Sequence, residues 1–146
     1  MRPMRFATVL LLLLAAPAVA RVGDPAAAFA ASPLIQQLRL SPSSQAAADG
    51  GTVQRYVSDD QAITVDLVVR GGMIEQQVMY VPMDLQRGIQ VTFFLQDAVG
   101  SLVGAQKGML AFRPAIANRS ETFMTFGGYT MRFTPMGALL RVLVSR

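Results

Sequence analysis

The chain has 146 residues and a formal net charge of +4, and it contains neither cysteine nor histidine. Without these two residue types there is no disulfide, no Cys-His or Ser-His nucleophile pair and no conventional zinc site. The basic residues are spread singly along the chain, so the sequence does not predict nucleic-acid binding. It contains no motif that predicts a cofactor.

The first twenty residues have the pattern of a signal peptide. Two arginines, Arg2 and Arg5, precede an apolar run from Phe6 to Ala16, and Pro17 is followed by the small-x-small sequence Ala18-Val19-Ala20. The run is shorter than the roughly 20 apolar residues that span a bilayer. We therefore expect cleavage after Ala20, a periplasmic or secreted location, and no transmembrane segment after cleavage.

Residues 21–51 are predicted to form a flexible or docking N-terminal extension, because alanine, proline, serine, glutamine and glycine dominate them. One apolar island interrupts this composition, and Pro33 is placed to open a helical turn there. The apolar residues of the island are Leu34, Ile35, Leu38 and Leu40. The island either folds back onto the domain or docks onto a partner, and disorder throughout the extension is the third interpretation.

From Thr52 onward the hydrophobic pattern has period two, and Gly71-Gly72 predicts a first hairpin. Glycine adopts without steric cost the positive φ that both central positions of a type I′ turn need. With these glycines as the loop, one face carries the pairs Val69–Ile74, Leu67–Gln76, Val65–Val78 and Ile63–Tyr80. That face is apolar apart from Gln76, as a half-buried sheet requires.

Gly127-Gly128 predicts a second hairpin in the same way. Its apolar face carries the pairs Phe126–Tyr129, Met124–Met131 and Thr122–Phe133. Its other face pairs Thr125 with Thr130 and Phe123 with Arg132. A slip of one residue would mix the two sets, so the pattern specifies the register.

Four further segments are predicted as strands: 52–57, 89–96, 109–112 and 138–144. Phe94 departs from the alternation of its segment and points off the main face. The last segment follows Thr134-Pro135, which also suits a helix start, but its alternation favours a strand. About seven or eight short strands predict an all-β domain over residues 52–146, an antiparallel β-sandwich.

Two chemical interpretations remain for the polar and sulfur-containing residues. Seven methionines follow the signal peptide, and Met79 and Met83 are the only close pair in a position suited to Cu(I), although core packing explains them better. Asp59 and Asp60 lie in a turn, where carboxylates usually cap their own backbone rather than catalyse.

The sequence favours a non-enzymatic interaction or structural subunit of a bacterial envelope, secretion or surface assembly. Its partner would be an envelope or extracellular protein, or a second copy of itself. Phe123 and Arg132 form a cation–π pair on the outward face in this interpretation. The residues assigned to partner contact are Leu34, Ile35, Leu38, Leu40, Phe94, Phe123 and Arg132.

Two other functional classes stay open. In the first, the domain encloses a small apolar ligand or lipid in a cavity behind aromatic side chains, which are Phe93, Phe112, Phe126, Tyr129 and Phe133. In the second, it is an enzyme that uses two converging carboxylates or a tyrosine.

Overall fold

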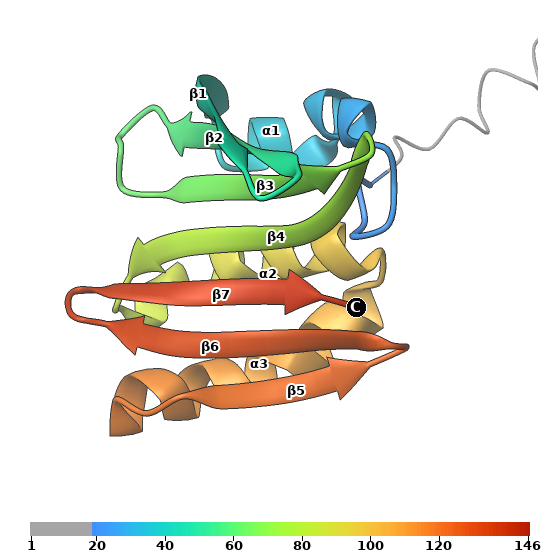
Figure 1. Cartoon of the computed structure of the whole chain (residues 1–146). Helices are drawn as coiled ribbons and strands as arrows, with labels where there is room; N and C mark the ends of the chain where they lie inside the picture. The colour runs from blue at the N-terminus through green and yellow to red at the C-terminus, as the bar shows by residue number, and fades with distance from the viewer. Residues whose placement is uncertain (1–18) are drawn as a thin grey trace, which may run out of the picture.

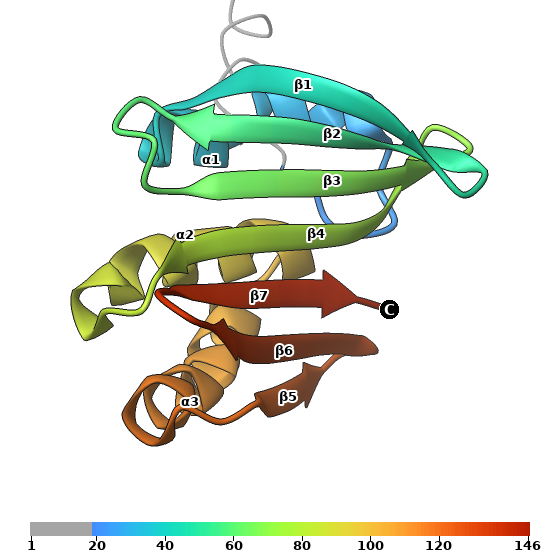
Figure 2. The same cartoon turned by 60° about the vertical axis from the view of Figure 1, so that its left-hand side comes forward.

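The computed structural model describes residues 19–146 and shows one seven-stranded antiparallel sheet with helices on one of its faces (Figures 1 and 2). Most of the predicted signal peptide, residues 1–18, lies outside the described residues. The strands are β1 (Leu40–Ala48), β2 (Gly51–Ser58), β3 (Thr64–Arg70), β4 (Met73–Pro82), β5 (Thr122–Phe126), β6 (Tyr129–Met136) and β7 (Leu139–Ser145). The helices are η1 (Ala26–Ala31), α1 (Pro33–Gln37), η2 (Leu85–Arg87), α2 (Gly88–Val99) and α3 (Leu102–Asn118).

The sheet consists of two meanders joined side by side, in the order β1-β2-β3-β4-β7-β6-β5. Strands β1 to β4 form the first meander and β5 to β7 the second, and β7 pairs with β4. Helices α2 and α3 connect the two meanders, and α2 lies behind β4 and β7 while α3 lies behind β6 and β5 (Figure 2). None of the helices within residues 19–146 is long and apolar enough to cross a membrane.

The prediction of an antiparallel, predominantly β domain is confirmed, and so is the strand at 138–144, which is β7. The prediction of a sandwich with a second sheet is wrong for residues 19–146, because helices form the second layer. The segments predicted as strands at 89–96 and 109–112 lie in α2 and α3.

The helical period explains why α2 is a helix. Its buried residues Val91, Phe94, Leu95 and Ala98 are spaced by three and four, so they share one helical face, and Phe94 is no exception to this pattern. Gly100 ends the helix with a φ of 69°, in the left-handed region that favours glycine. Apolar residues also recur at every second position, which favoured a strand over a helix in the sequence; they are Ile89, Val91, Phe93 and Leu95.

The second Gly-Gly hairpin has the predicted register at all five pairs of β5 and β6, from Phe126–Tyr129 to Thr122–Phe133. Gly127 and Gly128 have φ of 54° and 84°, as a type I′ turn requires.

The first hairpin follows the prediction only next to its turn. Val69 pairs with Ile74 as expected, but an irregularity between Val68 and Val69 shifts the rest of the register by one residue. Val65 consequently pairs with Met79. The β4 residues on the helix-covered face are therefore Gln77, Met79 and Val81 in place of Gln76, Val78 and Tyr80.

The predicted boundary at residue 52 falls inside the hairpin formed by β1 and β2. Strand β1 pairs with β2 along its length, and Pro33 opens helix α1 as the sequence indicated. Phe29 of η1 is fully buried and contacts the Tyr56 ring edge to face, with centroids 4.8 Å apart. The segment treated as an extension thus supplies an edge of the sheet and part of its helical cover.

Two glycines let α3 lie close to its neighbours. A Cβ at Gly104 would lie 2.6 Å from the Phe126 ring and 2.9 Å from Val99, which is closer than real Cβ atoms approach. A Cβ at Gly108 would lie 2.6 Å from the sulfur of Met131. The core between α3, α2 and the sheet has no spare room at these positions.

We expect Gly104→Ala to destabilise the domain and Gly88→Ala in α2 to have little effect. Both changes gain up to about 1 kcal/mol of helix propensity. Only the first overpacks the core, at a cost of about 1–3 kcal/mol, because a Cβ at Gly88 would meet Met109 at an ordinary 3.6 Å. The free energy of unfolding from urea titrations measures both variants, and equal values would contradict this packing.

Candidate functional site

Five of the seven residues assigned to partner contact lie in the domain's own core. Leu34, Leu38, Leu40 and Phe94 are buried, and Ile35 packs against the same core. Residues 34–38 pack against the sheet because α1 turns its apolar side inward. The structure therefore does not present the four buried side chains to a partner, and the partly buried Ile35 lines a surface hollow.

Phe123 and Arg132 are brought together on the uncovered face of the sheet, where they form a cross-strand pair of β5 and β6. The Phe123 side chain is 62% exposed. Arg132 donates a hydrogen bond to Glu121, which also accepts one from Thr134. The hydrogen bond from Arg132 is the main reason that the pKa of Glu121 lies below its usual value. The guanidinium is thus held by a carboxylate.

Strand β1 is a free edge of the sheet, and sequence reasoning did not identify it as a strand. Every residue from Ser41 to Ala48 is exposed, and none of them is charged. Natural edge strands usually carry charges, prolines or bulges that prevent pairing with another chain. Here the protection is limited to Pro42 and an irregular register next to it. The rest of the edge consists of serine, glutamine and alanine.

Strand β1 is anchored at both ends. Leu40 is buried at its start. Beyond its end, Arg70 donates a hydrogen bond to the carbonyl of Asp49 at 3.1 Å. Gly51 begins β2 so close to β3 that a Cβ there would lie 2.2 Å from the carbonyl oxygen of Val69. The edge is therefore preformed, which lowers the entropic cost of binding.

A second unusual feature is a buried polar cluster around Asp97, near the end of α2. Ser32 donates a hydrogen bond to Asp97 Oδ1, and the backbone N–H of Ala20 donates another at 3.0 Å. The Gln77 side chain of β4 donates to the carbonyl of Ala20. The cluster ties the segment before η1 to α1, α2 and β4.

Asp97 is only 3% exposed, and its second oxygen, Oδ2, has no hydrogen-bond partner within residues 19–146. Burial raises the pKa of Asp97, although its polar neighbours Ser32, Ala20 and Gln77 oppose this. A raised pKa means that folding favours the protonated form. The carboxylate taken alone therefore lowers stability as the pH rises through its pKa.

The carboxylates Asp59 and Asp60 do not converge on a reacting centre. Asp60 accepts hydrogen bonds from the Ser58 hydroxyl at 2.6 Å and from the Ala62 N–H at 3.0 Å, as expected for a turn cap. The first of these is the main cause of its lowered pKa. Asp59 instead contacts Arg39, and residues 19–146 contain no group of three His, Cys, Asp or Glu able to hold a metal.

Of the aromatic side chains considered for a ligand cavity, Phe112, Tyr129 and Phe133 are buried in the core, and Phe93 and Phe126 pack against it partly buried. Phe133 is fully buried and its ring lies 6.4 Å from that of Phe112. Phe126 fills the space against Gly104, and Tyr129 donates a hydrogen bond to the carbonyl of Val22 at 3.3 Å. Of the methionines considered for copper, Met79 is fully buried and Met83 packs against the core.

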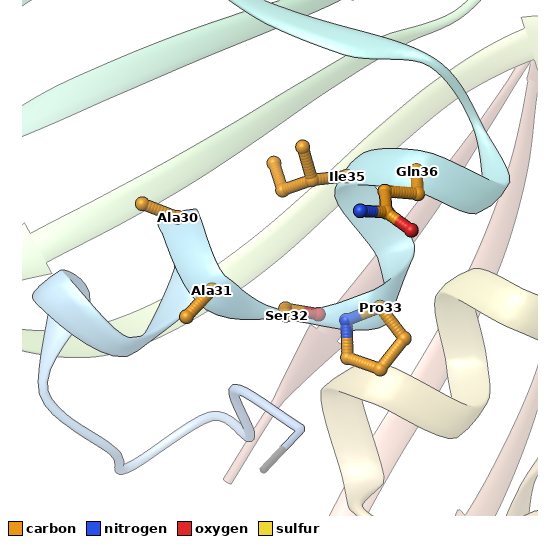
Figure 3. A pocket seen from close by; sticks show the side chains of 6 residues that line it. All are labelled: Ala30, Ala31, Ser32, Pro33, Ile35 and Gln36. Atoms are coloured by element: carbon orange, nitrogen blue, oxygen red, sulfur yellow. The ribbon is translucent and has the colours of Figure 1, made fainter. Parts of the chain in front are cut away.

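Two of the surface hollows near α1 are lined by residues of the buried polar cluster. Figure 3 shows the first, at the junction of η1 and α1, which is lined by Ala30, Ala31, Ser32, Pro33, Ile35 and Gln36. The second lies between α1 and α2 and is lined by Val19, Pro33, Leu34, Gln37, Phe93, Gln96 and Asp97. The second hollow connects the buried polar cluster to the surface, because Asp97 lines it.

The chain matches no protein-family model, no curated protein and no solved structure.

We expect Ser32→Ala to destabilise the domain more than Ser101→Ala. Both serines cap a helix, at Leu34 N (3.1 Å) and Gly104 N (3.0 Å), and loss of a cap costs about 1 kcal/mol. Only Ser32 also donates a hydrogen bond to the buried carboxylate of Asp97. Its loss leaves that carboxylate without one of its donors, which adds a cost of about 1–3 kcal/mol. Urea unfolding of both variants measures the difference, and equal losses would refute the role of Ser32 in the cluster.

Proposed function

We propose that this protein is an exported, non-enzymatic interaction subunit of a bacterial envelope, secretion or surface assembly. It binds a strand of another envelope or extracellular protein along the free edge of β1. The observation that carries this proposal is the anchored, uncharged and exposed stretch from Ser41 to Ala48. The signal-peptide pattern of residues 1–20 supports the location.

Strand addition uses the unpaired N–H and C=O groups of a sheet edge, and side-chain contacts supply specificity. The small serine and alanine side chains of β1 leave room for an incoming strand. The opposite edge, β5, has five residues against nine in β1. A shorter ladder supplies fewer backbone hydrogen bonds, so β1 is the better acceptor.

A photo-crosslinking amino acid placed at Ala46 of β1 is expected to give one discrete adduct in cells that make the full-length protein. The same amino acid at Ala117, which is exposed on α3, is the matched control and is expected to give none. Mass spectrometry of the adduct identifies the partner, or a second copy of the chain. Absence of any adduct across β1, tested also at Ser44 and Ala48, would contradict the proposal.

The charge variant Ala47→Lys is expected to reduce the Ala46 adduct several-fold, because a lysine on an edge strand opposes pairing. The domain is expected to stay folded, since Ala47 is exposed. Ala117→Lys makes the same chemical change away from the edge and should leave the adduct unchanged. Equal adduct yields in the two variants would mean that the partner contacts β1 without pairing with it as a strand, and would contradict the proposal.

A further inference from the structure

Ala20 belongs to the folded domain, although the predicted cleavage site lies just after it. It is 0% exposed, and both its polar backbone atoms bind buried side chains. Its N–H donates to Asp97, and its carbonyl accepts from Gln77. Cleavage after Ala20 would remove this residue and deprive both buried side chains of a partner, which is costly for buried polar groups.

The residues that follow are held in the same way. The N–H of Val22 donates to the carbonyl of Ala98 at 2.9 Å, and that of Gly23 donates to the carbonyl of Ile74 at 2.7 Å. Ala20 is thus the first residue of a segment built into the contact between α2 and β4.

The sequence contains a second small-x-small pattern two residues earlier, Ala16-Pro17-Ala18. Cleavage after Ala18 leaves Val19 as the first residue and keeps Ala20 in the mature chain. Val19 lines the same hollow as Asp97, and Ala20 next to it already donates to Asp97 Oδ1. Oδ2 of this carboxylate is buried and lacks a partner within residues 19–146.

We propose that signal peptidase cleaves between Ala18 and Val19, and that the α-ammonium group of Val19 then binds the free oxygen of Asp97. Water hydrolyses the peptide bond, so that the carboxyl stays on Ala18, and the released amine of Val19 takes up a proton at neutral pH. The new charge gives the buried carboxylate the partner that it lacks. This inference rests on the proposed export of the protein.

The charges around the cluster favour a cation at this point. Asp97 is the one buried acid there, and Asp24 is the charged residue whose field adds to the local negative potential. Arg21 is the nearest cation along the chain, and it pairs with Asp24 at 3.5 Å with its side chain half exposed. The carboxylate of Asp97 has no cationic partner among the side chains of residues 19–146. An ammonium group would neutralise its buried charge.

The first test is the N-terminal sequence of the protein purified from the cell envelope. The proposal predicts Val19 as the first residue. A first residue of Arg21 would overturn the inference and leave the proposed export intact. An uncleaved chain retained in the cytoplasm would overturn both.

The second test measures the pKa of the α-amino group in the purified exported protein. Reductive ¹³C-methylation labels only two sites, this amine and Lys107, which is the one lysine of the chain and serves as an internal control. The proposal predicts a pKa above the ordinary range of about 7.7–8.0 for the α-amine. A value within that range would refute the pairing without any variant being needed.

Two variants assign the shift to its source. Asp97→Asn is expected to return the pKa of the α-amine to its ordinary range, and Asp24→Asn, the matched change at a nearby carboxylate, is expected to leave most of the shift. The reverse result would place the ammonium beside Asp24 and overturn the assignment.

Stability gives an independent readout with a definite sign. An ammonium whose pKa is raised by folding stabilises the domain below its unfolded pKa, and this stabilisation is lost as the pH rises through the folded value. Asp97→Asn should therefore increase the unfolding equilibrium constant about tenfold at pH 7 for each unit by which the pKa is raised, and much less above pH 10. If burial alone governed Asp97, the substitution would instead stabilise the protein at pH 7.

Discussion

The pairing of β4 with β7 is the constraint on which the rest of the structure depends. Seven residue pairs, from Gln76–Ser145 to Pro82–Leu139, join two meanders that are separated in sequence by α2 and α3. Because β4 and β7 are central strands, their apolar residues Met79 and Val142 face each other in the middle of the core. Both helices between them must then cross one face of the sheet, which leaves the other face uncovered.

This arrangement also explains why a polar cluster is buried beside the core. Helix α2 carries Asp97 near its end, and β4 carries Gln77 on the covered face because of the irregularity in the first hairpin. The segment from Ala20 passes between the two and supplies the backbone groups that they bind. The same segment leads through η1 and α1 to β1. The proposed N-terminal ion pair and the proposed binding edge therefore lie at the two ends of one anchored segment.

The two hairpins differ in how strictly the alternation of apolar and polar residues specifies the strand register. In the second hairpin polar residues alternate with apolar ones around Gly127-Gly128, so only one register separates the faces, and the prediction was correct at every pair. In the first, Val78-Met79-Tyr80-Val81 is apolar throughout, so a one-residue shift costs little burial and the pattern cannot exclude it. The candidate edge strand β1 was not predicted from the sequence, because its residues after Leu40 are exposed and do not alternate between apolar and polar types.

The sequence by itself determined the export pattern, the absence of cysteine and histidine chemistry, the two glycine turns and the strands beside them. These follow from local composition and from steric preferences at single positions. Only the tertiary structure decided that residues 88–118 are helices, that residues 40–48 form an edge strand, and that Ala20 is buried against Asp97 and Gln77. In α2 a helical period and an every-second-residue alternation are both present in the sequence, and packing against the sheet selects the helix. The edge strand and the burial of Ala20 depend on contacts between residues far apart in the chain, and such contacts leave no periodic signal in the local sequence.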